Sequence, residues 1–211
     1  MIALQERKPF AVGRTRQCYV HPDDDGLCVK VDTVGGGARS PNESERRHLT
    51  RVQTLRGGKP FEACTNFHGV ETTDLGPGYV FDLIRDEPGG TISRPVAEYL
   101  ELPPDRDLNE RLQCALDEFQ SAVMRDGVVL RDPQTYNICV QVRGDRELSF
   151  VAVDGFGHRN VLPIVDFVPF MARRATLRHL ARRGLTDLAA MRLTHVRNAE
   201  RWKSLRGPAL A

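Results

Sequence analysis

The chain has 211 residues, of which 40% are hydrophobic and 27% charged, and its formal net charge is +2. This composition is typical of a folded globular protein and excludes fibrous or largely disordered chains. The first residues, MIALQERKPF, lack the apolar core of a signal peptide, and charges interrupt every apolar stretch before it could span a membrane. Five scattered cysteines without a CxxC pair predict reduced thiols, no disulfide framework and no zinc site, and so a cytoplasmic protein.

The charge is unevenly distributed along the chain. From Met171 onward there are ten basic and two acidic residues, whereas the first 170 residues carry a net charge of −6. Such a basic segment either forms the solvated face of helices that dock on an acidic body, or contacts phosphate, nucleic acid or a membrane surface. The sequence favours the solvated face, and peripheral membrane contact through the basic C-terminus stays open.

The first part of the chain is predicted to be rich in β-strands. A short strand, FAVG, precedes a hairpin of residues 17–21 and 27–33, which alternate in polarity around the turn DDDG. Two further strands lie in FHGVETTDLGPGYVFDLIRD, around a turn at DLGPG. These segments predict an antiparallel sheet within the first 85 residues or so.

One helix is predicted between the two pairs of strands, in SPNESERRHLTRVQTLRGG. Ser40 is the expected N-cap, Pro41 occupies the first helical position, and Glu43 completes a capping box. Gly57 and Gly58 end the helix, since glycine accepts the left-handed conformation that helix ends adopt.

The periodicity changes after a linker rich in Pro and Gly. A helix that ends at Gly127 is predicted from apolar residues on one face, namely Leu108, Leu112, Ala115, Leu116, Phe119 and Val123. A hairpin of residues 138–142 and 148–153 follows, then basic helices from about Pro163 to Ser204 and a loose tail, RGPALA. The predicted fold is therefore α+β and two-lobed: a β-rich lobe (1–85), a linker (86–95) and a mostly helical lobe (96–211).

Five polar residues occur in an informative order: Lys30 on a strand, Glu45 on a helix, Asp132 and Asn137 on a loop, and Asp154 at a strand end. This is the order of parts in protein-kinase-like phosphotransferases. In those folds the strand lysine holds phosphates and pairs with the helix glutamate, and the loop aspartate orients or deprotonates the acceptor hydroxyl. The loop asparagine and the last aspartate hold Mg²⁺. The stretch LRDPQTYN matches H-R-D-L-x-x-x-N in its Arg, its Asp and the step to Asn.

The chemistry of phosphoryl transfer explains these residue types, because the reaction needs positive charge and alignment, and Mg²⁺ prefers oxygen ligands. We therefore expect Asp132 to be catalytic, Lys30 and Glu45 to position the phosphates of ATP, and Asn137 and Asp154 to bind Mg²⁺. Each residue alone has an ordinary explanation as a solvated lysine or a turn residue. Only the five together, in this order, favour the site.

Two further choices concern the same region. Glu43 competes with Glu45 for the role of the helix glutamate, but Glu45 shares its helix face with Leu49 and Val52 and should point inward, where a charged partner is needed. The stretch YVFDLI is predicted to pass from one lobe to the other. The backbone of Asp82, Leu83 and Ile84 should then face adenine, with Phe81 guarding the pocket, although an ordinary core strand is an alternative for Phe81.

The sequence also departs from protein kinases. The stretch VGRTRQCY has only Gly13, so a glycine-rich phosphate loop is missing, and Arg14 and Arg16 are candidates to hold phosphate instead. The turn DGFG at Asp154 is one residue longer than D-F-G, and Gln134 stands where Ser/Thr protein kinases carry lysine. Only 57 residues follow Asp154, too few for a full activation segment and a large helical lobe.

Several stretches, GRTRQCYVHPDD, CVKV, FHGVETTDLGPGYVFDLI and NICV, make the chain resemble the YrbL-like family, bacterial proteins described as part of the PhoP regulatory network. The resemblance covers nearly the whole chain. It implies a kinase-like fold and a link to magnesium-responsive regulation and envelope stress, but no defined reaction.

The leading hypothesis is an ATP- and Mg²⁺-binding phosphotransferase that acts on a hydroxyl of a small molecule or protein. The alternative is a pseudokinase that serves as a regulatory binding module through nucleotide or its basic tail. Binding to nucleic acid is the weakest of the three, because the basic stretch has no aromatic stacking platform.

Overall fold

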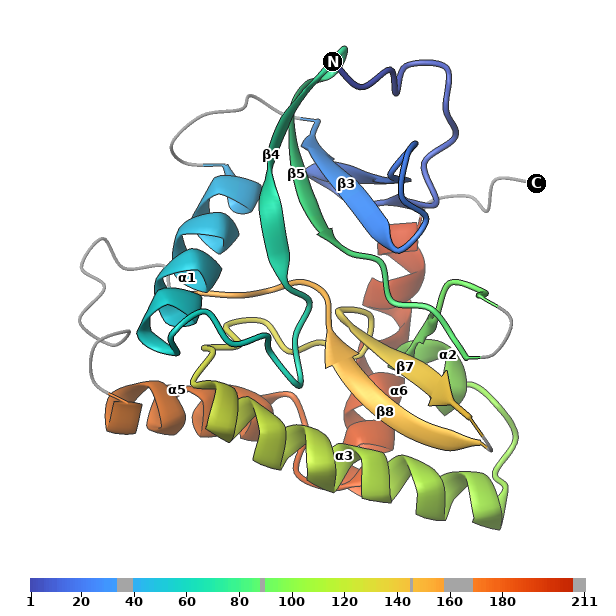
Figure 1. Cartoon of the computed structure of the whole chain (residues 1–211). Coiled ribbons are helices and arrows are strands. Elements are labelled where there is room, and N and C mark those ends of the chain that lie inside the picture. The colour runs from blue at the N-terminus through green and yellow to red at the C-terminus, as the bar shows by residue number, and fades with distance from the viewer. Residues whose placement is uncertain (34–39, 88–89, 145, 158–168, 207–211) are drawn as a thin grey trace.

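The computed structural model of the chain describes residues 1–33, 40–87, 90–144, 146–157 and 169–206, and it describes side chains for all of these except residues 169–172 and 199–206. Figure 1 shows an antiparallel sheet with one helix beside it, above a part made of helices and a smaller sheet. The predicted α+β architecture with a β-rich first part and a mostly helical second part is therefore confirmed. The predicted tail after Arg206, the start of the basic region at residues 163–168 and linker residues 88–89 lie outside the described residues.

The larger sheet has the strand order β1-β2-β3-β5-β4, and all its neighbouring strands are antiparallel. Its strands are β1 (Ala11–Val12), β2 (Arg16–Val20), β3 (Leu27–Asp32), β4 (Phe67–Thr73) and β5 (Gly76–Asp82). Both predicted pairs of strands form, because each joins two alternating segments through a short turn. The central position of β3 places Lys30 in the middle of the sheet, opposite Cys18 on one side and Tyr79 on the other.

Helix α1 (Pro41–Leu55) begins and ends where the sequence predicts. The Ser40 side chain accepts a hydrogen bond from the Glu43 N–H at 3.0 Å, and Gly57 and Gly58 adopt positive φ just after the helix. The second half of the predicted capping box is wrong, since the Glu43 carboxylate instead accepts hydrogen bonds from Arg46 and Arg47. Two arginines one turn further along the helix offer stronger, charged donors than a backbone N–H.

The second part of the chain contains the sheet order β6-β7-β8. The predicted hairpin forms β7 (Ile138–Arg143) and β8 (Glu147–Ala152), and the predicted long helix is α3 (Arg106–Asp126), which ends at Gly127 with φ 69°. The sequence did not predict β6 (Arg94–Pro95) or α2 (Val96–Leu100), which are too short to show a period. Helices α5 (Pro169–Arg182) and α6 (Leu188–Arg206) form the basic C-terminal segment.

One apolar core runs through both parts. It contains Leu49 of α1, Phe81 of β5, Leu112 of α3 and Phe150 of β8, all buried. All five cysteines are free thiols, as predicted. No helix in the described ranges is both long enough and apolar enough to cross a bilayer.

The end of α3 links the two parts by polar contacts. The buried Asp126 accepts hydrogen bonds from the backbone N–H groups of Glu62 and Ala63, each at 2.9 Å, and its other oxygen lies 3.0 Å from the Arg56 guanidinium. Ala63 and Thr65 in turn pair with the backbone of Ala152 at the end of β8. The segment after α1 is thereby fixed to the segment that leads into Asp154.

Candidate functional site

The candidate site forms where β2, β3 and α1 face the end of β8. Arg16 on β2 lies two residues before Cys18, which is directly opposite Lys30 on β3. Because alternate residues of a strand share a face, Arg16 and Lys30 both project from the same side of the sheet. Helix α1 covers this side and directs Asn42 and Glu45, one turn apart and fully buried, toward the two cations.

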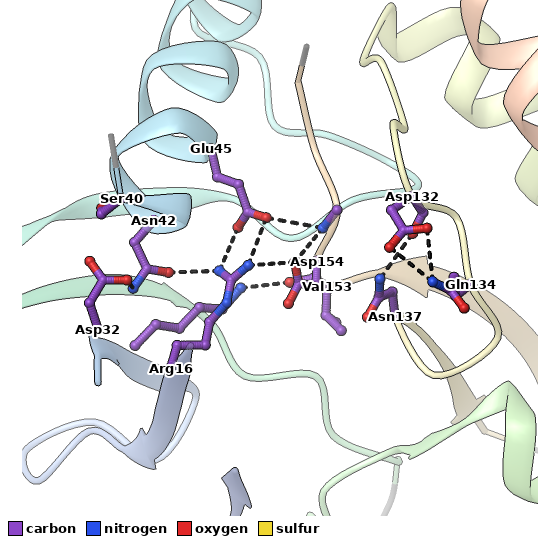
Figure 2. Close-up of polar contacts among 12 residues, drawn as sticks. Arg16, Asp32, Ser40, Asn42, Glu45, Asp132, Gln134, Asn137, Val153 and Asp154 are labelled. Carbon is purple, nitrogen blue, oxygen red and sulfur yellow. Dashed lines mark hydrogen bonds and ion pairs between the residues drawn. The ribbon is translucent and has the colours of Figure 1, made fainter. Parts of the chain in front are cut away.

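Arg16 is the centre of the polar network in Figure 2. Its two terminal nitrogens donate hydrogen bonds to the two oxygens of the Glu45 carboxylate, at 2.9 and 3.1 Å. The same nitrogens also donate to Asn42 Oδ1 and to Asp154 Oδ1, each at 2.7 Å. The Asn42 amide also donates to Asp32 at 2.8 Å. The guanidinium therefore joins strand β2, helix α1 and the turn after β8.

The structure pairs Glu45 with Arg16 and not with Lys30, which corrects the pairing predicted from the kinase pattern. The Lys30 ammonium donates to the Val153 carbonyl at 2.6 Å and lies 4.1 Å from the centre of the Phe81 ring. A guanidinium presents two parallel N–H groups that match both oxygens of a carboxylate, whereas an ammonium is a single point charge. Arg16 therefore takes the two-oxygen partner, and Lys30 the single carbonyl.

Burial and charge act in opposite directions on the two carboxylates. Burial alone would raise the pKa of Glu45, but the charges of Arg16 and Lys30 and the hydrogen bonds from Arg16 bring that pKa below its ordinary value. Burial and then the Glu45 carboxylate raise the pKa of Asp154, more than Arg16 and Lys30 lower it. The two carboxylates share one guanidinium and therefore differ in pKa. Glu45 loses its proton at lower pH than Asp154 does.

The extra glycine of the DGFG turn joins this network to the loop at Asp132. The Gly155 N–H donates to Glu45 at 3.0 Å, and the Gly155 carbonyl accepts from the N–H groups of Arg131 and Asp132 at 2.8 and 3.1 Å. Gly155 has φ +86°, and a Cβ atom there would lie 2.7 Å from the Asp132 carbonyl oxygen. Only glycine allows this close approach, which accounts for the departure from D-F-G.

The Asp132 loop is fixed by its own side chains. The Gln134 amide donates to both carboxylate oxygens of Asp132 at 3.0 Å, and Arg183, just after α5, forms an ion pair with Asp132 Oδ1 at 2.7 Å. The Asn137 amide nitrogen donates to the Asp132 carbonyl at 2.9 Å, which leaves Asn137 Oδ1 as its acceptor atom. The Asp132 carbonyl and the Asp132 carboxylate are thus both fixed by hydrogen bonds.

Asn137 and Asp154 are suitable ligands for Mg²⁺. They approach the same residue, Gly155, since the Asn137 amide nitrogen lies 3.3 Å from where a Cβ of Gly155 would be and Asp154 accepts from the Gly155 N–H. The Asp154 side chain is 30% exposed, so it is not sealed in the core. In the described ranges no group of three or more His, Cys, Asp or Glu side chains could hold a metal. Mg²⁺ suits the smaller set, since it binds through one or two protein oxygens together with phosphates and water.

The predicted adenine-facing segment has several partners inside the protein. Phe81 is fully buried. The Asp82 carboxylate accepts hydrogen bonds from both N–H groups of Asn66, and the Leu83 N–H donates to the Gly26 carbonyl at 2.7 Å. The Ile84 carbonyl accepts from the Ser93 N–H at 2.9 Å. Adenine contact at this segment stays a prediction.

Sequence analysis did not identify Asp32, Asn42 or Arg183, which the structure places in these contacts. Asn42 could have been found, because it continues the inward stripe of Glu45, Leu49 and Val52 on α1. Arg183 is one of many arginines in the chain and lies 51 residues from Asp132 in the sequence, so no local pattern points to it. Arg16 was identified as a phosphate candidate, but not as the partner of Glu45.

Comparison with known proteins gives two kinds of similarity. The proteins named "Uncharacterized protein YrbL" from Escherichia coli and Shigella flexneri are each 28% identical over 168 residues, covering 79% of this chain and 79% of theirs. Among solved structures, the PknI kinase domain of Mycobacterium tuberculosis matches with a TM-score of 0.45 and 14% identity, over 70% of this chain and 57% of that domain. A structural match this partial adds nothing to the architecture described above.

The family described as "PhoP regulatory network protein YrbL" matches residues 2–183. This match includes both sheets, α1, α3, α5 and every residue of the candidate site. The kinase-like order of strands, helix, loop and final aspartate thus lies within the matched region. The chain belongs to the YrbL family.

Proposed function

We propose that the protein binds ATP with Mg²⁺ and transfers the γ-phosphoryl group to a hydroxyl acceptor. The observation that supports this most strongly is the convergence of the network around Arg16, Glu45 and Asp154 with the loop of Asp132 and Asn137, through the backbone of Gly155. Cations, oxygen ligands and a carboxylate base are the parts that phosphoryl transfer needs.

Each residue has a role that its contacts allow. Lys30 and Arg16 supply positive charge for the phosphates, and Glu45 holds Arg16 in place. Asn137 and Asp154 would hold Mg²⁺, which neutralises charge on the phosphates when bound. Asp132 orients the acceptor hydroxyl and takes its proton as the oxygen bonds to the γ-phosphorus. The bond to ADP breaks, and ADP leaves with the electron pair.

The family description connects this reaction to regulation in the PhoP network. We infer that the protein acts in that magnesium-responsive context, on an acceptor that is either a small molecule or a protein. A magnesium-dependent phosphotransferase would respond to the same ion as the network.

A regulatory pseudokinase is the second candidate, and one observation favours it. Asp154 already has Arg16 as its partner, and both Asp132 oxygens already accept hydrogen bonds from Gln134. In a pseudokinase, these contacts would serve as permanent structural bonds. In a phosphotransferase, they would be exchanged for metal and acceptor.

The test is thermal unfolding of the full chain with and without ATP and Mg²⁺. A ligand at about 100 times its dissociation constant adds roughly 2.7 kcal/mol, which raises the melting temperature by a few degrees. We expect a shift that requires Mg²⁺ in the wild type and is lost in Asp154→Asn. The exposed Asp117 on α3 provides the control, since Asp117→Asn should keep the shift. No shift at millimolar ATP would contradict nucleotide binding.

Turnover then separates the two candidates. We expect Asp132→Asn to keep the ATP-dependent shift and to lose ATP hydrolysis by about two orders of magnitude or more, because a base acts on the transferred proton and not on ATP binding. A wild type that shows the shift but hydrolyses no ATP, with or without added hydroxyl compounds, would be a pseudokinase.

A further inference from the structure

Helix α5 runs beside the segment that leads into Asp132. Thr176 donates to the Val128 carbonyl at 3.2 Å, Ala175 packs against Val129, and the residue after the helix, Arg183, reaches Asp132. One side of the helix therefore packs on residues 128 and 129, and its C-terminal end lies next to the candidate base.

The outer face of α5 carries a row of arginines. Arg174, Arg178 and Arg182 are four residues apart, all exposed, and the row ends next to Arg183. Residues at this spacing lie above one another on a helix, so the row covers about 12 Å. No ion pair of these three arginines occurs with any residue in the described ranges, and α5 contains no acidic residue.

An anion bound along the row would relieve the repulsion between its charges. Like charges four residues apart repel each other weakly on a helix. The acid at the end of α5, Asp132, is already paired with Arg183. Guanidinium groups bind phosphate through pairs of parallel N–H groups, and successive arginines of the row can each take one phosphate.

We propose that the arginine row on α5 is the docking site for the phosphoryl acceptor, and that this acceptor is a small hydroxyl compound carrying phosphate groups. Its anionic groups bind Arg174, Arg178 and Arg182, and its hydroxyl reaches Asp132 beyond the end of the row. This inference rests on the proposed function, since it names the acceptor class of the same site.

The surroundings of the row favour a small anion over a membrane or a nucleic acid. The apolar side of α5, including Ala175 and Leu180, is buried against the protein and cannot enter a bilayer. Leu177 is the one large apolar side chain exposed on the described part of α5, and no aromatic side chain is described beside it for bases to stack on.

The experiment measures the binding of inorganic tripolyphosphate to the full chain by titration calorimetry, without nucleotide or magnesium. We expect the double variant Arg178→Glu/Arg182→Glu to weaken binding about tenfold or more. The double variant Arg7→Glu/Lys8→Glu makes the same change in net charge at exposed positions far along the chain and should weaken binding less than about twofold. Lys30→Met serves to distinguish the two sites, because Lys30 belongs to the nucleotide site and lies outside the row, so the Arg178→Glu/Arg182→Glu loss should also be seen in the Lys30→Met background.

Three results would overturn the proposal. Equal losses in both double variants would show that only net charge matters. A loss confined to Lys30→Met would place the probe in the nucleotide site. Displacement of tripolyphosphate by random duplex DNA, or by vesicles of phosphatidylglycerol and phosphatidylcholine in equal parts, would make α5 a surface for a macromolecular partner or a membrane. Because no nucleotide is present, a negative result here overturns the row and leaves the nucleotide site untouched. A missing ATP shift contradicts the proposed function, and with it the role of the bound anion as acceptor, but it does not change the titration result at the row.

Discussion

At the scale of single residues, the site depends on which cation meets which carboxylate. The kinase pattern assigns the helix glutamate to the strand lysine, but in this protein a second cation, Arg16, lies on the neighbouring strand and competes for it. Glu45 pairs with the guanidinium because Arg16 donates to both oxygens of Glu45 and also to Asp154. Lys30 instead donates to the Val153 carbonyl.

Removal of Arg16 should be strongly destabilising. Arg16→Met leaves Glu45 fully buried and without its cation, and we expect a loss of about 3 kcal/mol in the free energy of unfolding, measured in urea. Arg16→Lys should recover less than half of this loss, because lysine cannot bind both oxygens. The exposed Arg14 is the control, and Arg14→Met should change the free energy by less than about 0.5 kcal/mol. Equal effects at the two positions would contradict the network.

Gly155 should tolerate no side chain. Gly155→Ala adds a Cβ atom 2.7 Å from a backbone oxygen, at a φ of +86° that alanine rarely adopts. Gly57 is a matched control, since it has φ +68° and open space around its Cβ position. We expect Gly155→Ala to cost about 2 kcal/mol more than Gly57→Ala in the free energy of unfolding, measured by chemical denaturation. Similar costs would mean that the turn and the Asp132 loop are not in tight contact.

At the scale of elements, α1 carries the inward stripe that places Asn42 and Glu45 against the sheet. Its start is set locally by Ser40 and Pro41, and its first turn is stabilised by the contacts of Glu43 with Arg46 and Arg47. Hydrogen bonds from Arg46 and then Arg47 lower the pKa of Glu43 to about 2. The helix that positions the site therefore depends on an ionised carboxylate.

The stability contributed by Glu43 should disappear in acid. The pKa of Glu43 is lower in the folded protein than in the unfolded chain, where it is 4.5. The ionised carboxylate therefore stabilises the fold at pH values above 4.5, and this stabilisation is lost as the pH falls toward 2. We expect Glu43→Gln to be about 1 kcal/mol less stable than the wild type at pH 7, with a difference in the free energy of unfolding that narrows as the pH falls from about 5 to about 2. Glu110→Gln, in the exposed pair with Arg106, should differ little from the wild type throughout. A gap for Glu43→Gln that stays constant with pH would contradict this assignment.

At the scale of the whole molecule, the site exists because two parts of the chain share one core and several polar links. Asp126 binds the segment after α1, and Ala63 and Thr65 pair with Ala152 just before Asp154. These contacts fix α1 and the turn after β8 relative to each other, so Glu45 and Asp154 meet at one guanidinium. Helix α5 completes the arrangement by bringing Arg183 to the loop from the far end of the chain.

The sequence by itself determined most of the elements, because their signals are local. Ser40 and Pro41 mark a helix start, Gly127 a helix end, and the alternation around DDDG a hairpin. It also identified residues that the fold brings to one network, including Glu45 over Glu43, from the face of α1 on which each lies. The sequence did not predict the short elements β6 and α2, because segments of two and five residues are too short to show a hydrophobic period.

Only the tertiary structure decided the partners. Arg16 and Asp154 are 138 residues apart, and Arg183 and Asp132 are 51 apart, so no spacing along the chain predicts either contact. The choice between Arg16 and Lys30 depends on how far each side chain reaches across the sheet and how its N–H groups are arranged. The sequence supplied the charges, and the packing of α1, β8 and α5 against one sheet determined which charges are buried together.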